Sequence, residues 1–100
     1  MIAIEQTKRF KKEFDLMLKR GKDPKKFKAF FDLLLHNVNK GFKYNCLPSN
    51  YRLHKLSGQY DGCWEAHIEP DWLLIYYLDN EVLRLQHTGT HSDLFNKVRK

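Results

Sequence analysis

The spacing of hydrophobic residues changes near residue 50 from the period of a helix to the period of a strand. In the first half, the apolar positions that start at Phe10 and at Phe27 recur at the intervals of one helical face. In the second half, apolar and polar residues alternate from Trp64 to Glu69, and a continuous apolar run follows. A chain that carries helices first and strands afterwards is restricted to an α+β arrangement.

Both predicted helices have clear end signals. Thr7 can cap the first helix and Gly21 can end it. Asp23 and Pro24 suit the start of the second helix, and Gly41 suits its end. Because so few residues separate the two elements, we expect them to form an antiparallel helical hairpin.

The remaining segments are predicted to form a small sheet. Ile2 and Ile4 alternate with their neighbours and indicate a short opening strand, whereas 42–53 is expected to be a loop. Later strands are predicted at 64–69, 73–78 and 82–88, and 92–95 is predicted to be a final turn or short helix. The order β-α-α-β-β-β predicts one α+β domain over 1–100, with the hairpin packed on one face of a mainly antiparallel sheet.

Positive charge is concentrated in the first half of the chain. The net charge is +6; residues 1–50 hold twelve Lys/Arg and five Asp/Glu, and residues 51–100 hold six and seven. This asymmetry indicates a polyanionic partner, although a solvated helix face is an equal alternative. That partner would be a nucleic acid or an acidic protein, and the basic residues that could contact it are Lys8, Arg9, Lys11, Lys12, Lys19, Lys25 and Lys26.

Cysteine content and hydropathy indicate the cellular compartment. Cys46 and Cys63 form no CxxC pair, which disfavours a disulfide framework or a structural zinc site. The first ten residues contain no apolar signal core, and no window approaches the roughly 18 apolar residues of a membrane span. We therefore expect a cytoplasmic protein without a membrane partner.

Titratable residues of the second half are candidates for acid–base chemistry. His54, His67, His87 and His91 lie there, and Asp71 follows His67 by four positions. Histidine can supply both acids and bases near neutral pH. A zinc site is the alternative, but its usual ligand spacings are missing, and no G-x-S-x-G or phosphate-loop motif is present.

Three strings in this half carry a family resemblance. They are HKLSG at 54–58, EAHIEPDWLLIY at 65–76 and TGTHSDLF at 88–95. In this order and spacing they resemble the YafQ-type toxins of the RelE/ParE superfamily. Residues 1–41 agree with that family only in layout, as a strand and two helices.

The resemblance implies an mRNA interferase that cuts messenger RNA in the ribosomal decoding site without a metal or other cofactor. It also implies a cognate antitoxin, with DNA reached only indirectly through the antitoxin complex. Matching positions place the family's active site on His54, His67, Asp71, Trp72, His91 and Phe95.

Metal-free RNA cleavage needs a base for the 2′-OH, an acid for the leaving 5′-oxygen, and positive charge at the phosphate. His91 is the expected acid, and Asp71 or His54 is the expected base. Trp72 and Phe95 can stack on a splayed base, or they can instead pack at the sheet edge.

One position departs from the family pattern. The family usually has arginine four residues before the last histidine, where this chain has His87. Arg84 is a possible substitute for binding the phosphate, but strand alternation places it on the opposite face from His87 unless a bulge intervenes. Arg52 and Lys55 are further candidates. The alternatives to a ribosome-dependent nuclease are a ParE-like toxin that does not cut RNA, and a weakened toxin that acts mainly by binding its antitoxin.

Overall fold

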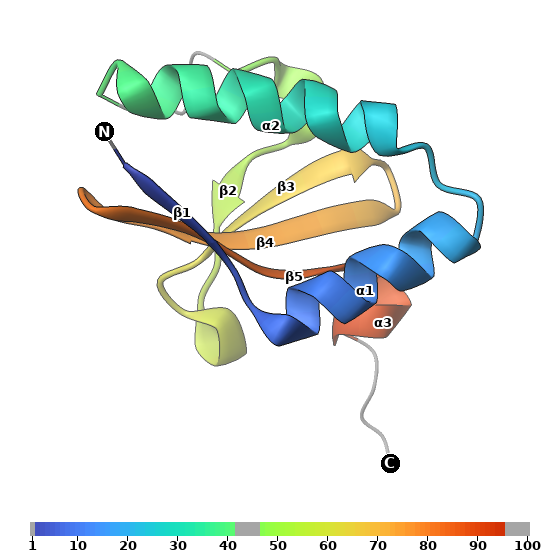
Figure 1. Ribbon diagram of the computed structural model, residues 1–100. Coiled ribbons are helices and arrows are strands. Elements are labelled where there is room, and N and C mark those ends of the chain that lie inside the picture. Colours follow the sequence, from blue (N-terminus) through green and yellow to red (C-terminus); the bar gives the residue numbers. More distant parts are fainter. Residues whose placement is uncertain (1, 42–46, 96–100) are drawn as a thin grey trace.

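Five strands form one sheet in the order β1-β5-β4-β3-β2 in the computed structural model, which describes residues 2–41 and 47–95 (Figure 1). The strands are β1 (Ala3–Gln6), β2 (His54–Lys55), β3 (Trp64–Glu69), β4 (Trp72–Leu78) and β5 (Val82–Gly89). Strand β1 is parallel to β5, and the other neighbours are antiparallel. The predicted α+β class and the mainly antiparallel sheet are confirmed.

The helices begin and end at the predicted signals. They are α1 (Lys8–Lys19), α2 (Pro24–Asn39) and the short α3 (His91–Phe95). Thr7 Oγ1 accepts a hydrogen bond from Phe10 N at 2.9 Å, which satisfies a free backbone donor at the start of α1. Gly21 follows α1 with φ of 94°, a left-handed conformation that favours glycine.

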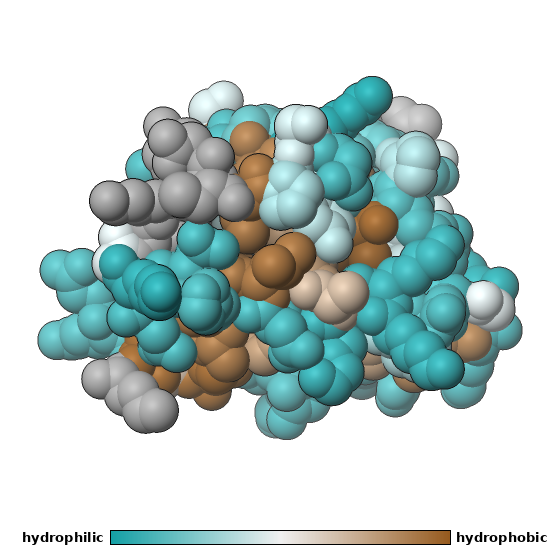
Figure 2. Space-filling model, turned by 90° about the horizontal axis from the view of Figure 1, so that it is seen from above, coloured by the Kyte–Doolittle hydropathy of each residue, from teal (hydrophilic) through white to brown (hydrophobic). Residues whose placement is uncertain are grey.

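The main core lies between one face of the sheet and the two long helices. Helix α1 packs against β5 and α2 against β3, and the helices meet where the rings of Phe14 and Phe27 lie 5.0 Å apart. The predicted hairpin on one face is therefore confirmed. Seen from the α2 side, hydrophobic residues reach the surface among hydrophilic ones (Figure 2). Buried members of this core include Phe10, Met17, Phe30, Leu34, Ala66, Trp72, Leu74, Tyr76, Leu83 and Leu85.

The opposite face of the sheet is only partly covered. A second cluster there contains Cys63, Leu73, Ile75 and Leu94, and α3 and the 3-10 helix η3 (Gly58–Tyr60) lie over it. The predicted loop at 42–53 contains the 3-10 helix η2 (Ser49–Tyr51), and 42–46 lie outside the described residues. Strand β2 was not predicted, and it forms because it pairs with β3.

Strand β5 contains a bulge. Leu85 pairs with Tyr76 and His87 pairs with Ile75, so Gln86 has no partner on β4. The Gln86 carbonyl instead accepts a hydrogen bond from Thr7 Oγ1 at 2.9 Å. The extra residue shifts the alternation of side chains along β5 by one position, so Arg84 and His87 lie on the same face of the sheet. Simple alternation would place Arg84 and His87 on opposite faces, whereas the bulge that was the stated exception is present.

None of the helices in the described part of the chain is long and apolar enough to cross a membrane.

Candidate active site

Three histidines from three separate elements form a row on the sheet face opposite the long helices. His54 lies in β2, His67 in β3, and His91 is the first residue of α3. The ring centres of His54 and His67 are 6.2 Å apart, and those of His67 and His91 are 5.6 Å apart. The side chains of His54 and His91 are each 53% exposed, whereas that of His67 is 8% exposed. The outer two histidines are therefore accessible to a substrate.

Asp71 holds the His91 ring in one orientation. Its Oδ1 accepts a hydrogen bond from the His91 backbone N–H at 2.8 Å and another from His91 Nδ1 at 2.6 Å. These backbone and side-chain hydrogen bonds lower the pKa of the Asp71 carboxyl below its usual value. Because Nδ1 donates to Asp71, Nε2 is the ring nitrogen that His91 offers to a substrate.

A buried carboxylate lies between the other two histidines. Glu65 Oε1 is 3.1 Å from His54 Nε2 and 3.8 Å from His67 Nε2. On its other side, His54 Nδ1 donates to the Arg52 carbonyl at 3.0 Å, because a carbonyl can only accept. In the neutral form of the His54 ring the proton is therefore on Nδ1, and the lone pair is on Nε2, 3.1 Å from Glu65 Oε1. Glu65 was not among the predicted site residues.

His67 differs from its neighbours because it is buried. Burial lowers the pKa of its ring, and the negative charge of Glu65 only partly opposes this effect. The His67 Nδ1 atom has no hydrogen-bond partner among the described residues. A ring with a lowered pKa is mostly neutral, and therefore a poor proton donor, at neutral pH.

A set of polar contacts fixes the corner between β5 and α3, which carries His91. Asp93 Oδ2 accepts hydrogen bonds from Thr90 N at 2.9 Å and from Arg20 Nη1 at 2.8 Å. A Cβ atom added at Gly89 would lie 3.0 Å from Asp93 Cβ, so a larger residue there would press on the Asp93 side chain. Helix α1 is thereby tied to the short helix that begins with His91.

A similar contact supports the turn before Asp71. Glu69 Oε1 accepts a hydrogen bond from Lys22 Nζ at 2.8 Å, and Glu69 Oε2 accepts one from Lys26 Nζ at 2.9 Å. Lys26 is one of the basic residues predicted to contact a polyanion; its side chain is 56% exposed and also forms an ion pair with this carboxylate. The other basic residues of that set on α1 and α2 are exposed.

The predicted aromatic residues occupy different environments. Trp72 is 0% exposed and donates from Nε1 to Thr88 Oγ1 at 2.9 Å within the main core. The prediction that Trp72 stacks on a base is therefore wrong, because neither face of its ring reaches solvent. Phe95 is 41% exposed and meets the ring of Tyr60 edge-on at 5.5 Å, so its ring remains available.

The two residues proposed to bind phosphate on β5 already have acidic neighbours. His87 Nδ1 lies 3.3 Å from Glu13 Oε1, and its ring meets Tyr60 at 5.3 Å. Arg84 Nε donates to Glu5 Oε1 at 2.9 Å. Arg84 also lies five positions before Gly89, which corresponds to about 16 Å along the strand. Each of these two side chains therefore already lies next to a carboxylate.

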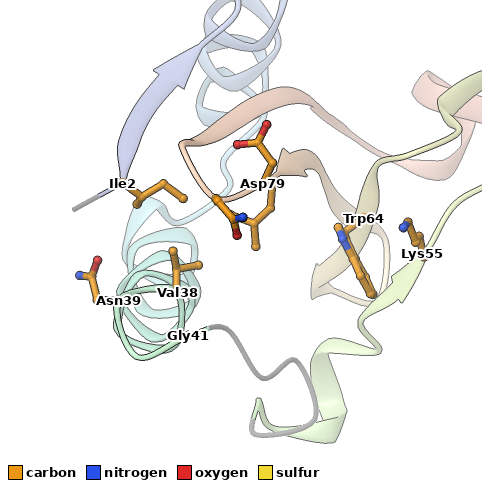
Figure 3. A pocket seen from close by; sticks show the side chains of 9 residues that line it. Ile2, Val38, Asn39, Gly41, Lys55, Trp64 and Asp79 are labelled. Carbon is orange, nitrogen blue, oxygen red and sulfur yellow. The ribbon is translucent and has the colours of Figure 1, made fainter.

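One cavity lies away from the histidine row, and of the candidate residues only Lys55 lines it. It has a volume of about 450 Å³ and lies between the end of α2, Trp64 and the β4–β5 turn (Figure 3). The cavity borders the end of β4 at Leu78, which is about 20 Å from the start of the strand at Trp72, next to Asp71. A smaller cleft of about 300 Å³ adjoins His67 and is lined by Asn50, Arg52, His67, Ile68, Glu69 and Pro70. Among the described residues, no group of three His, Cys, Asp or Glu side chains is arranged to hold a metal ion.

Comparisons with known proteins agree on one family. The model of the family described as "Bacterial toxin of type II toxin-antitoxin system, YafQ" matches residues 2–96. The mRNA interferase toxin YafQ of Escherichia coli K12 is 41% identical over 92 residues, which cover 92% of this chain and 94% of that protein. A chain of the E. coli DinJ–YafQ complex is 40% identical with a TM-score of 0.81, over 95% of this chain and 99% of that chain. A metal-bound toxin from Helicobacter pylori is 31% identical with a TM-score of 0.76, over 95% of this chain and 100% of that chain.

Proposed function

The chain belongs to the YafQ family of toxins from bacterial type II toxin–antitoxin systems, and we propose that it is a metal-independent endoribonuclease. It cuts messenger RNA on the ribosome in the cytoplasm and so stops translation, and a cognate antitoxin protein neutralises it. It meets DNA only through the antitoxin complex. The observation that carries this proposal is the row of His54, His67 and His91 with Asp71 bound to His91.

Cleavage proceeds by attack of a ribose 2′-oxygen on the adjacent phosphorus. The new P–O2′ bond forms while the P–O5′ bond breaks, which leaves a 2′,3′-cyclic phosphate and a 5′-hydroxyl. One group must take the 2′-OH proton and another must protonate the 5′-oxygen, and each role contributes about 10²–10⁴ to the rate. The exposed rings of His54 and His91, on either side of His67, supply the two roles.

We assign the acid to His91 and the base to His54. His91 Nε2 is the ring nitrogen left free by Asp71, which acts as a positioning residue. His54 accepts the proton at Nε2, and Glu65 at 3.1 Å stabilises the imidazolium that forms. Asp71 is the weaker choice of base because its pKa is lowered by its two hydrogen bonds from His91.

Phe95 is the residue proposed to stack on an unpaired RNA base beside this row. Its ring is partly exposed and is held edge-on by Tyr60, whose hydroxyl donates to the Leu94 carbonyl at 3.2 Å. Splayed RNA bases are commonly read against aromatic faces of this kind.

The decisive experiment is a purified translation reaction in which primer extension maps breaks in the message. We expect ribosome-dependent breaks that end in a cyclic phosphate. Protein treated with EDTA before it is added to ribosomes in magnesium should cut equally well, because side chains supply the acid and the base. The metal-bound relative from H. pylori makes this arm necessary.

Two results would contradict the proposal. Inhibited translation without any break in the message would favour a toxin of the ParE type or one that acts through antitoxin binding alone. Activity that EDTA removes and zinc restores would show that a metal, rather than the histidine pair, drives cleavage.

The exposed lysines of α1 are proposed to contact ribosomal RNA. Reversing Lys8, Lys11 and Lys12 to glutamate is expected to weaken ribosome binding and to reduce the slope of log affinity against log salt by about 0.7–0.9 for each lost phosphate contact. Titration of labelled protein with ribosomes at several salt concentrations measures this slope. Reversal of Lys28 and Lys40, which lie outside the proposed contact set, is the control. An unchanged slope would show that the α1 lysines do not contact ribosomal RNA and only form a solvated helix face.

A further inference from the structure

Arg52 is a cation beside the histidine row whose guanidinium has no ion-pair partner within 2–41 and 47–95. Other arginines of the region are already paired: Arg20 binds Asp93, and Arg84 binds Glu5. Lys55 instead lies over the ring of Trp64 at 5.7 Å and lines the distant cavity. A polyanion that approaches the row therefore meets an available positive charge at Arg52.

The backbone of Arg52 is held in an unusual conformation. Its φ of 47° and ψ of 48° are left-handed, and no other non-glycine residue in the described part of the chain has a positive φ. Such strain persists only where the surrounding structure fixes it, and it is often found at functional sites. Here the conformation lets the Arg52 carbonyl accept a hydrogen bond from His54 Nδ1 at 3.0 Å.

The side chain of Arg52 lines the cleft of about 300 Å³ beside His67. Strand β2 pairs only with Trp64 and Glu65 of β3, and the cleft lies beside the later residues Ile68 and Glu69 of that strand. His67 also lines the cleft, and its buried Nδ1 has no hydrogen-bond partner among the described residues. Arg52 and His67 line the same cleft, and the positive charge of Arg52 adds to the effects that lower the pKa of the His67 ring.

We propose that Arg52 binds the RNA phosphate at the cut and stabilises the negative charge that develops there. The inference rests on the nuclease function proposed above and names a residue for a role that His54, His67 and His91 do not fill. A guanidinium can bind two phosphate oxygens at once, and it keeps its charge at all relevant pH values. The same residue thus orients the base through its carbonyl and binds the phosphate through its side chain.

The test compares substitutions that separate these two contributions. Arg52→Asn removes the charge but tolerates the left-handed backbone, so the carbonyl remains available to His54. We expect its single-turnover rate on ribosome-bound message to fall about 10²–10³-fold at every pH, with unchanged ribosome affinity and thermal stability. Arg52→Lys keeps the charge without the forked geometry and should lie in between.

Lys28→Gln is the matched control, because it removes one exposed positive charge on the outer side of α2 that pairs with Asp32. It should cut at the rate of the unchanged protein. A rate for Arg52→Asn equal to that of the control would overturn the inference. An equal loss in both Arg52 variants with a shifted pH profile would also overturn it, because the effect would then come from a displaced His54. A protein that cuts nothing before substitution would instead refute the proposed function itself.

Discussion

Replacing His91 with alanine is expected to lower the rate of mRNA cleavage about 10²–10⁴-fold, because the leaving 5′-oxygen then has no proton donor. The change removes one hydrogen bond from Asp71 and leaves the backbone bond from residue 91 in place. The fold and antitoxin binding should therefore be preserved. Single-turnover cleavage, thermal unfolding and a binding titration with the antitoxin measure the three quantities.

His36→Ala is the matched control for His91→Ala. His36 is an exposed histidine of α2 and lies outside the histidine row. It should cut at the rate of the unchanged protein. Equal rates for the two variants would remove His91 from the mechanism, and loss of antitoxin binding in His91→Ala alone would indicate a change of structure instead.

Replacing Trp72 with alanine is expected to lower the free energy of unfolding by about 3–5 kcal/mol, the usual cost of deleting a large buried aromatic ring. Trp72 is fully buried beside Phe14 and Phe27, and its N–H donates to Thr88. Natural domains have only about 5–15 kcal/mol of stability, so this single change removes a large share. Urea unfolding followed by circular dichroism measures the loss.

Phe95→Ala separates packing from substrate stacking. Phe95 is partly exposed at the end of α3, so its loss should change stability by less than about 0.5 kcal/mol while it slows cleavage. A stable Trp72→Ala variant that cuts slowly would reverse this assignment and make Trp72 a substrate contact after all.

The parts of the fold that local signals determine could be predicted from the sequence. Thr7 and Asp23 accept hydrogen bonds from the first turns of their helices, as their positions indicate, and Gly21 ends α1. Strand β2 could not be predicted because a two-residue strand has no alternation to detect. It is defined only by its pairing with β3, which is a non-local contact.

The candidate site shows the same division between local and non-local information. The family strings identified His54, His67, Asp71 and His91, which the structure brings together. Alternation also placed Glu65 on the same face as His67, but its burial depends on what covers that face. For Trp72, matching positions of the family suggested stacking on a base, and packing was the alternative; its full burial decides for packing, and this burial depends on the helices that cover that face.

The parallel pairing of β1 with β5 has a consequence for how the protein is made. Ala3 pairs with Val82, and the ion pair between Glu5 and Arg84 spans 79 positions of the chain. Helices α1 and α2 form from local contacts, but β1 has no neighbour until β5 has been translated. Because β5 leads directly into α3, the edge of the sheet and His91 are completed in one late step of synthesis. A nascent chain that has not reached this step is expected to be harmless to the ribosome that produces it.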